Sequence, residues 1–164
     1  MLMMKATSIV LYVEDEEMDR FLMGRAFGKE GLGTALQMVN DGQAAIDYLL
    51  GSGHYSDREK HPLPAVVLLD LNLPEVHGFE VLKWIRAHPV HLKLPVVIFS
   101  SSEREEDQEK ARLLGATEFV KKPGSGLSFR DVVRKLNERW LSRLETTVTS
   151  PPARLQPPAS SAST

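Results

Sequence analysis

The sequence predicts a doubly wound α/β domain, in which helices cover both faces of a parallel sheet. Short apolar segments rich in β-branched residues alternate along the chain with longer segments of helical periodicity. The apolar segments are nearly continuous, as expected of strands that are buried on both faces. Because strands separated by single helices are joined by right-handed crossovers, neighbouring strands should run parallel.

Two strands and two helices are expected in the first part of the chain. Residues 8–13 (SIVLYV) form an apolar, β-branched run that is typical of a buried strand. Residues 16–30 carry apolar side chains at helical spacing, and Gly31 ends that segment. Residues 34–39 (TALQMV) are predicted to be the second strand, and residues 43–50 the second helix.

The alternation resumes after a long connection. Residues 54–64 (HYSDREKHPLP) are polar and contain two prolines, so we expect a loop there. Strands are then expected at residues 65–69, 96–100 and 117–121, and helices at residues 79–87, 103–114 and 129–144.

Composition limits the class of protein. The 164 residues suit one domain, or one domain with a tail, and 42% hydrophobic residues are enough for a core. The formal net charge of −2 gives no overall positive field that would attract nucleic acid. No cysteine is present, which excludes disulfides, thiolate metal sites and cysteine nucleophiles.

We expect a cytoplasmic protein that does not enter a membrane. No apolar run approaches the length of a membrane span, and the apolar start of the chain is too short for a signal sequence. The folded domain should comprise residues 1–145. Residues 146–164 are rich in Pro, Ser and Thr and cannot bury enough apolar surface to offset chain entropy, so we expect a disordered tail.

Polar side chains with a shared chemistry follow four of the five expected strands. Glu14 and Asp15 follow the first strand, and Asp70 follows the third. Ser100 ends the fourth strand, and Lys122 follows the fifth. Parallel sheets bind ligands outside the carboxyl ends of their strands, so these side chains should meet at one edge. Clustered carboxylates favour a hard divalent cation such as Mg²⁺, and a phosphoryl group on Asp70 would find donors in Lys122 and Ser100.

Each of these residues alone has an ordinary structural explanation. Acidic residues at strand–helix junctions commonly cap the next helix, and Ser102 and Glu105 have the spacing of a capping box. A buried serine can bond to the backbone, and a lysine before a proline is unremarkable. The joint occurrence of acids, hydroxyl and lysine at the ends of four strands favours a reactive site.

Four separated motifs carry a resemblance to a known family. They are VEDEE after the first strand, LLDLNLPEVHGFEVL around Asp70, PVVIFSSS in the fourth strand and GATEFVKKP in the fifth. In this order and spacing they resemble the receiver domain of bacterial two-component response regulators, over residues 6–145. The resemblance implies a flavodoxin-like sheet with strand order 2-1-3-4-5, flanked by five helices.

The resemblance also implies a phosphorylation site with a bound metal ion. Asp70 matches the aspartate that accepts a phosphoryl group from a histidine kinase. Asp15 matches the acid that coordinates Mg²⁺ directly, and Glu14 matches its partner, which usually acts through water. The backbone carbonyl of Asn72 matches the third protein ligand of the ion.

Further positions match the signalling residues of the family. Lys122 matches the lysine that pairs with the phosphoryl group, and the family implies a cis bond between Lys122 and Pro123. Ser100 matches the switch Ser or Thr, and Phe119 matches the switch aromatic residue. Phosphorylation should then draw Ser100 inward and let Phe119 rotate, which changes the face made by the fourth helix, the fifth strand and the fifth helix.

We therefore expect a single-domain response regulator that takes part in a Mg²⁺-dependent phosphorelay and signals through the changed face. Its partners should be a sensor histidine kinase and either a downstream protein or a second copy of the chain. Apart from its own phosphorylation and dephosphorylation, no enzymatic activity is expected.

Some details depart from the common pattern of the family. The acidic pair is Glu-Asp, where many receiver domains have Asp-Asp, and the added methylene bears on the geometry of the metal site. The loop at residues 54–64, residues 122–127 and the Trp140-Leu141 end of the last helix are similar to stand-alone regulators that partner bacterial phytochrome kinases.

Three alternatives differ in chemistry. A receiver-shaped interaction module that is never phosphorylated is compatible with the sequence, although the intact acids, hydroxyl and lysine argue against it. A flavodoxin-like FMN carrier would need a loop rich in Ser, Thr and Gly where the acidic residues 14–17 stand. An aspartyl-phosphate hydrolase for small molecules would carry a second carboxylate at the position of Asn72.

Two other features have ordinary interpretations. The last helix carries an apolar stripe that should pack mostly in the core, although Trp140 and Leu144 could form an interface. The five histidines are scattered without metal-ligand spacing and are expected at the surface: His54, His61, His77, His88 and His91.

Overall fold

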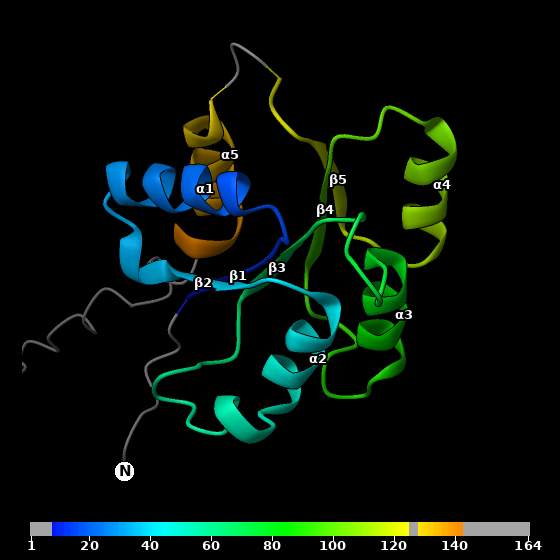
Figure 1. Cartoon of the computed structure of the whole chain (residues 1–164), viewed down its shortest axis with the longest axis horizontal. Helices are drawn as coiled ribbons and strands as arrows, with labels where there is room; N and C mark the ends of the chain where they lie inside the picture. The colour runs from blue at the N-terminus through cyan, green and yellow to red at the C-terminus, as the bar shows by residue number, and fades with distance from the viewer. Residues whose placement is uncertain (1–7, 125–127, 143–164) are drawn as a thin grey trace, which may run out of the picture.

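A five-stranded parallel sheet forms the centre of the molecule (Figure 1). The computed structural model describes residues 8–124 and 128–142. The strand order is β2-β1-β3-β4-β5, which confirms the predicted fold class and strand order. The strands are β1 (Val10–Val13), β2 (Leu36–Val39), β3 (Val66–Leu69), β4 (Val96–Ser100) and β5 (Glu118–Lys121).

Helices cover both faces of this sheet (Figure 1). α1 (Glu17–Lys29) and α5 (Phe129–Leu136) lie on one face, and α2 (Gly42–Leu50), α3 (Gly78–Ala87) and α4 (Glu105–Leu113) lie on the other. Among the described helices, none combines the length and the apolar character that a membrane span requires. The described residues also form two 3₁₀ turns, Gly33–Ala35 and Gly53–Tyr55, and a π-helical turn, Asn137–Leu141.

Every helix and strand starts within two residues of its expected position, and two of the differences have an identifiable local cause. The strand expected at residues 34–39 begins with a 3₁₀ turn, so only its last four residues pair with β1. α4 begins at Glu105 and not at residue 103, and the predicted capping box does not form. The Ser102 hydroxyl instead accepts a hydrogen bond from the backbone N–H of Arg104 (3.2 Å) and donates to Asp107 (2.6 Å), which organises the turn before α4.

Some expectations fall on residues that the structure does not describe. These are the last two residues of the helix expected at residues 129–144, including the interface position Leu144, and the tail expected at residues 146–164.

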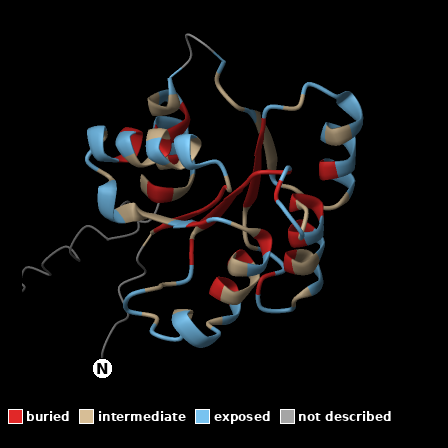
Figure 2. Cartoon of the chain, viewed as in Figure 1, coloured by how far each residue is buried: buried red, intermediate tan, exposed pale blue. Residues whose placement is uncertain are grey.

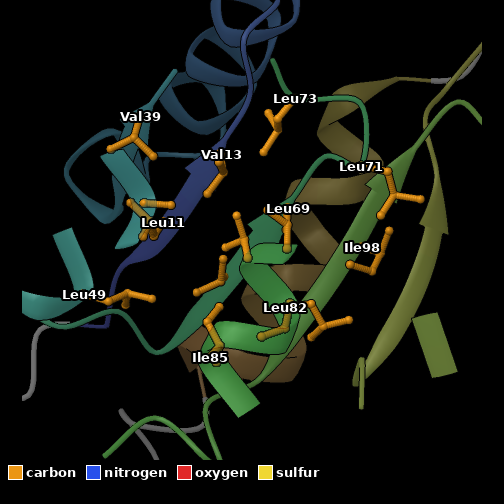
Figure 3. Packing of buried hydrophobic residues seen from close by; sticks show 14 of the residues in the cluster. Leu11, Val13, Val39, Leu49, Leu69, Leu71, Leu73, Leu82, Ile85 and Ile98 are labelled. Atoms are coloured by element: carbon orange, nitrogen blue, oxygen red, sulfur yellow. The ribbon is translucent and has the colours of Figure 1, made fainter. Parts of the chain in front are cut away.

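The central strands consist almost entirely of apolar residues because helices bury both faces of the sheet there (Figure 2). Successive side chains of a strand point to opposite faces. Leu11 and Val13 pack with Ile85 of α3 on one face (Figure 3), and Tyr12 packs with Phe99 among residues of α1 and α5 on the other. These two clusters hold the strands in register and so determine where their carboxyl ends lie.

α4 is bound to the core more lightly than the other helices. Of its nine residues, only Ala111 is buried. Its end is nevertheless tied to α3, because the Arg86 guanidinium donates to the carbonyl oxygens of Gly115 (2.8 Å) and Leu94 (2.7 Å).

The expected loop between α2 and β3 is organised by one arginine. The Arg58 guanidinium donates to the carbonyl oxygens of Tyr48 (2.8 Å) and Leu49 (2.9 Å) at the end of α2, and to that of His61 (3.1 Å). Gly51 has a φ of 68°, and a β-carbon there would lie 2.8 Å from a guanidinium nitrogen. Glycine therefore both ends α2 and leaves space for Arg58.

The histidines do not all lie at the surface. The expectation is wrong for His91, which is 6% exposed, and burial lowers its pKa. His54 and His61 pack against the rings of Tyr48 and Tyr55, with ring centres 5.1–5.8 Å apart. The polar connection folds back onto the end of α2, so its histidines serve as aromatic packing partners.

Candidate functional site

The carboxyl ends of four strands meet at one edge of the sheet, as the sequence predicts. The backbone N–H of Asp70 donates to the carbonyl oxygen of Val13 (3.1 Å), and the N–H of Lys122 donates to that of Ser100 (2.8 Å). The first bond places the residues that follow β1 beside those that follow β3. The second bond places the end of β4 beside the residue that follows β5. We call the resulting group the rim; it consists of Glu14, Asp15, Asp70, Ser100 and Lys122.

Asp70 is buried at this rim, with 3% exposure. Its Oδ1 accepts a hydrogen bond from the N–H of Asn72 (3.4 Å), and its Oδ2 lies 3.4 Å from the Lys122 ammonium. The following loop returns so closely that a β-carbon on Gly78 would lie 2.3 Å from the Asp70 carbonyl oxygen. A glycine at the start of α3 is therefore needed to keep this loop against Asp70.

Three acids of the rim could hold a metal ion. One carboxylate oxygen from each of Glu14, Asp15 and Asp70 lies within 4.8 Å of the others. Oxygen ligands at this separation suit a hard divalent cation, which would relieve their mutual repulsion. Asn72 adjoins the group through its N–H, and the ligand role of its carbonyl oxygen stays a prediction.

Glu14 is completely buried, and three donors surround its carboxylate. The Tyr12 hydroxyl donates to Oε2 (3.2 Å), the N–H of Glu16 donates to Oε1 (3.2 Å), and the Lys122 ammonium lies 2.8 Å from Oε2. Burial raises the pKa of Glu14 to about 7, although Lys122 acts to lower it. Burial also raises the pKa of Tyr12, so its hydroxyl remains a donor.

Lys122 is surrounded by carboxylates and is only 12% exposed. Its ammonium lies 2.8 Å from Glu14, 2.8 Å from Asp19 of α1 and 3.4 Å from Asp70. Burial alone would lower the pKa of Lys122, but hydrogen bonds to Asp19 and Glu14 and the charge of Asp70 hold this pKa above its usual value. This environment keeps Lys122 in its protonated form.

Sequence reasoning missed three side chains that contact the rim: Asp19, Tyr12 and Arg20, whose guanidinium donates to the Glu14 carbonyl oxygen (2.9 Å). Asp19 lies in the acidic first turns of α1, where carboxylates are common because they favour the helix dipole. Tyr12 looks like an ordinary core residue of β1. The place of Asp19 in the first turn of α1, directly after the acids that follow β1, was the local indication that it could face the rim.

The two expected switch residues differ in position. Ser100 is completely buried, and its hydroxyl accepts a hydrogen bond from the N–H of Ser102 (3.1 Å). Phe119 is half-buried in β5 and packs against the core cluster that faces α2, α3 and α4. The expected cis bond between Lys122 and Pro123 is wrong, since this bond is trans in the structure.

The sequence that contains the five rim residues matches the model of a known protein family. Residues 10–134 match the response regulator receiver domain. The chain belongs to this family. The resemblance carried by the four sequence motifs is therefore confirmed, and the family is that of two-component signalling.

Curated relatives of this receiver domain include proteins of similar length. Response regulator Rcp1 of Synechocystis sp. is 32% identical over 145 residues, which are 88% of this chain and 94% of Rcp1. The probable methanogenesis regulatory protein FilR2 of Methanothrix harundinacea is 34% identical over 133 residues, which are 81% of this chain and 83% of FilR2.

Solved structures of phytochrome response regulators are also similar to this receiver domain. The phosphorylated cyanobacterial phytochrome response regulator RcpA is 31% identical with a TM-score of 0.75, and the match covers 84% of this chain and 96% of RcpA. The Mn²⁺-bound form of Rcp1 is 31% identical with a TM-score of 0.70, covering 88% and 99% of the two chains. The predicted similarity to phytochrome-associated regulators is confirmed.

Proposed function

We propose that this receiver domain accepts a phosphoryl group on Asp70 from a histidine kinase, in a Mg²⁺-dependent reaction, and signals through a changed protein-binding face. One observation carries the proposal. The buried Asp70 carboxylate lies between acids that suit a cation, with oxygens within 4.8 Å, and the Lys122 ammonium at 3.4 Å. A nucleophile in this position can have the transferred negative charge neutralised from two sides.

Four groups would hold the Mg²⁺ ion: the carboxylates of Asp15, Asp70 and Glu14, the last through water, and the backbone carbonyl of Asn72. When bound, the ion neutralises the carboxylates and the oxygens of the transferred phosphoryl group. The Mn²⁺-bound form of Rcp1 supports a divalent cation as the cofactor.

The side chains of the rim have separate tasks in the transfer. An oxygen of Asp70 forms a bond to phosphorus while the bond from phosphorus to the histidine nitrogen of the kinase breaks, and that electron pair returns to the imidazole. The protonated Lys122 pairs with the phosphoryl oxygens, and the Ser100 hydroxyl donates to another of them. Beyond its own phosphorylation and dephosphorylation, we propose no enzymatic activity.

An apolar surface beside the rim supports a kinase as partner. Met18 and Phe21 of α1 are 64% and 61% exposed, and Met38 of β2 is 43% exposed. Arg20 and Arg25 border the shallow pocket between Phe21 and Met38. α1 starts directly after the rim acids, so a protein bound to this surface could bring its histidine to Asp70. Because phytochrome regulators are among the relatives, we propose a phytochrome-type kinase.

The output face would be formed by α4, β5 and α5. Movement of Ser100 towards the phosphoryl group would let Phe119 of β5 turn inward and alter this face. A groove between β5 and α5 is lined by apolar Val120, Leu136 and Trp140, together with charged side chains of both signs. Such a groove could bind a downstream protein or a second copy of the chain.

We also propose the extent and location of the functional unit. Residues 1–145 would form the receiver domain, in keeping with the family match over residues 10–134, and residues 146–164 would form a disordered tail. The protein would act in the cytoplasm, where ATP-dependent kinases work.

Acetyl phosphate tests the proposal without the cognate kinase. In the presence of Mg²⁺, the wild-type protein should gain one phosphoryl group, seen as a mass adduct that base removes. Asp70→Ala should gain none, and a chelator should prevent labelling of the wild type. Equal labelling of Asp70→Ala would contradict Asp70 as acceptor. An unlabelled wild type would favour the alternative of an interaction module that is never phosphorylated.

A further inference from the structure

The ammonium group of Lys122 is shared unequally among three carboxylates. It lies 2.8 Å from Glu14 and 2.8 Å from Asp19, but 3.4 Å from Asp70. An ammonium has three N–H donors, so these partners use its full capacity. The two shortest contacts go to residues other than the proposed phosphoryl acceptor.

Asp19 differs from the other two partners of Lys122. Its carboxylate does not belong to the group of oxygens that suits a cation, which comes from Glu14, Asp15 and Asp70. Within the described part of the chain, Lys122 is its only side-chain hydrogen-bond partner, although 103 residues separate the two. The side chains of Asp19 and Lys122 are 25% and 12% exposed, so solvent screens this contact only in part.

Phosphorylation would change which negatively charged groups compete for the Lys122 ammonium. Glu14 would turn to the cation, and the phosphoryl oxygens would add negative charge beside Asp70. Lys122 would then have to move its donors towards the phosphoryl oxygens. Asp19 is the partner that keeps attracting the ammonium away from them, because neither the cation nor the phosphoryl group engages it.

We propose that Asp19 is a positioning residue that competes with the phosphoryl group for Lys122 and thereby weakens the phosphorylated state. The inference rests on the proposed function and adds a residue that regulates the same site. Asparagine at this position keeps the shape of the side chain but removes its charge, which releases Lys122 towards Asp70.

Beryllofluoride, which mimics a phosphoryl group on aspartate without covalent transfer, provides the test. In saturating Mg²⁺, Asp19→Asn should bind it roughly fivefold more tightly than the wild type, as measured by titration calorimetry. Glu17→Gln removes a negative charge from the same part of α1 without a contact to Lys122, and its affinity should stay within roughly twofold of the wild type. Asp19→Glu keeps the charge and should restore nearly wild-type affinity.

The outcomes separate this inference from the proposed function. Unchanged or weaker binding by Asp19→Asn, or equal tightening by Glu17→Gln, would overturn the competition between Asp19 and the phosphoryl group. Failure of the wild type to bind beryllofluoride, with Asp70→Ala as the reference for no binding, would overturn the proposed function itself. Urea denaturation checks that each variant is folded, and Asp19→Ala supplies a second uncharged variant if Asp19→Asn is not.

Discussion

The carboxyl and amino ends of the sheet accommodate buried polar groups in different ways. At the carboxyl end, Glu14, Asp19 and Asp70 surround the single ammonium of Lys122, so negative charge exceeds positive charge. At the amino end, the Arg58 guanidinium donates to three backbone carbonyls and completes the end of α2. The first arrangement needs an ion for balance, whereas the second is satisfied within the chain.

This difference shows how the fold separates reactivity from stability. Buried carboxylates repel one another, so the free energy of the rim depends on pH, on metal and on phosphorylation. Neutral carbonyl groups bonded to an arginine have no such dependence. The Arg58 bonds at the amino end can therefore remain constant while the rim changes its charge.

The largest expected effect is the loss of Arg58. Arg58→Ala should lower the free energy of unfolding by about 3 kcal/mol, because strong hydrogen bonds from a charged donor are lost and half-buried carbonyls lose their partner. Urea denaturation measures the change. Beryllofluoride binding by the folded variant should equal that of the wild type, since Arg58 lies at the opposite end of the sheet.

Arg104→Ala is the matched control for this prediction. Arg104 is exposed, and within residues 8–124 and 128–142 its one ion pair is with exposed Glu106, so its loss should change the free energy of unfolding by less than about 0.5 kcal/mol. If the two variants lose equal stability, the amino end does not have the stabilising role assigned to it.

A smaller effect is expected from pH in metal-free buffer. Burial raises the pKa of Glu14 from 4.5 to about 7, so between these values the folded protein binds more protons than the unfolded chain. The stability that Glu14 contributes is complete below its unfolded pKa and is lost as the pH rises through 7. Linkage gives a loss of about 2 kcal/mol between about pH 5 and pH 8, measurable by urea denaturation with a chelator present.

Glu14→Gln is the control, because an amide does not titrate in this range. Without Glu14, the opposite contribution of the amino end should become visible. Burial, together with the neighbouring His88 and Arg58 side chains, lowers the pKa of His91. The stability that neutral His91 contributes is therefore present above its unfolded pKa of 6.5 and is lost as the pH falls. A Glu14→Gln profile that still falls with rising pH would show that another group causes the effect.

The smallest expected effect has the opposite sign from that of Arg58→Ala. Asp70→Asn should raise the free energy of unfolding of the metal-free protein by about 1 kcal/mol, because one carboxylate leaves a group with excess negative charge. Calorimetric melting with a chelator measures this change. When Mg²⁺ is added, the difference in free energy of unfolding between Asp70→Asn and the wild type should shrink. Only the wild type keeps all the proposed ligands and is stabilised by binding the ion. A less stable Asp70→Asn protein without metal would contradict the charge imbalance.

The sheet could be predicted because its signals are local. The three central strands, β1, β3 and β4, are apolar runs that end at a polar residue, and the order of elements restricts how parallel strands connect. The exceptions have local causes as well. Residues 34–35 join a 3₁₀ turn before β2, and the Ser102 hydroxyl delays the start of α4.

The rim could be predicted only in part. Glu14, Asp70 and Lys122 directly follow strands, so their convergence follows from the topology, and their functional roles remain predictions. The contact between Asp19 and Lys122 joins residues far apart in sequence and depends on how α1 packs on the sheet. Arg58 lies in a polar loop without periodicity, so nothing in the sequence marks its bonds to the end of α2.

The sparse packing of α4 has a consequence for the evolution of partner choice. Ala111 is the one residue of this helix that is buried, and Arg86 anchors the turn that follows it. Substitutions at the exposed positions of α4 open no cavity and cost little stability. Selection can therefore reshape this surface for a new binding partner while the sheet and the chemistry at its edge stay the same.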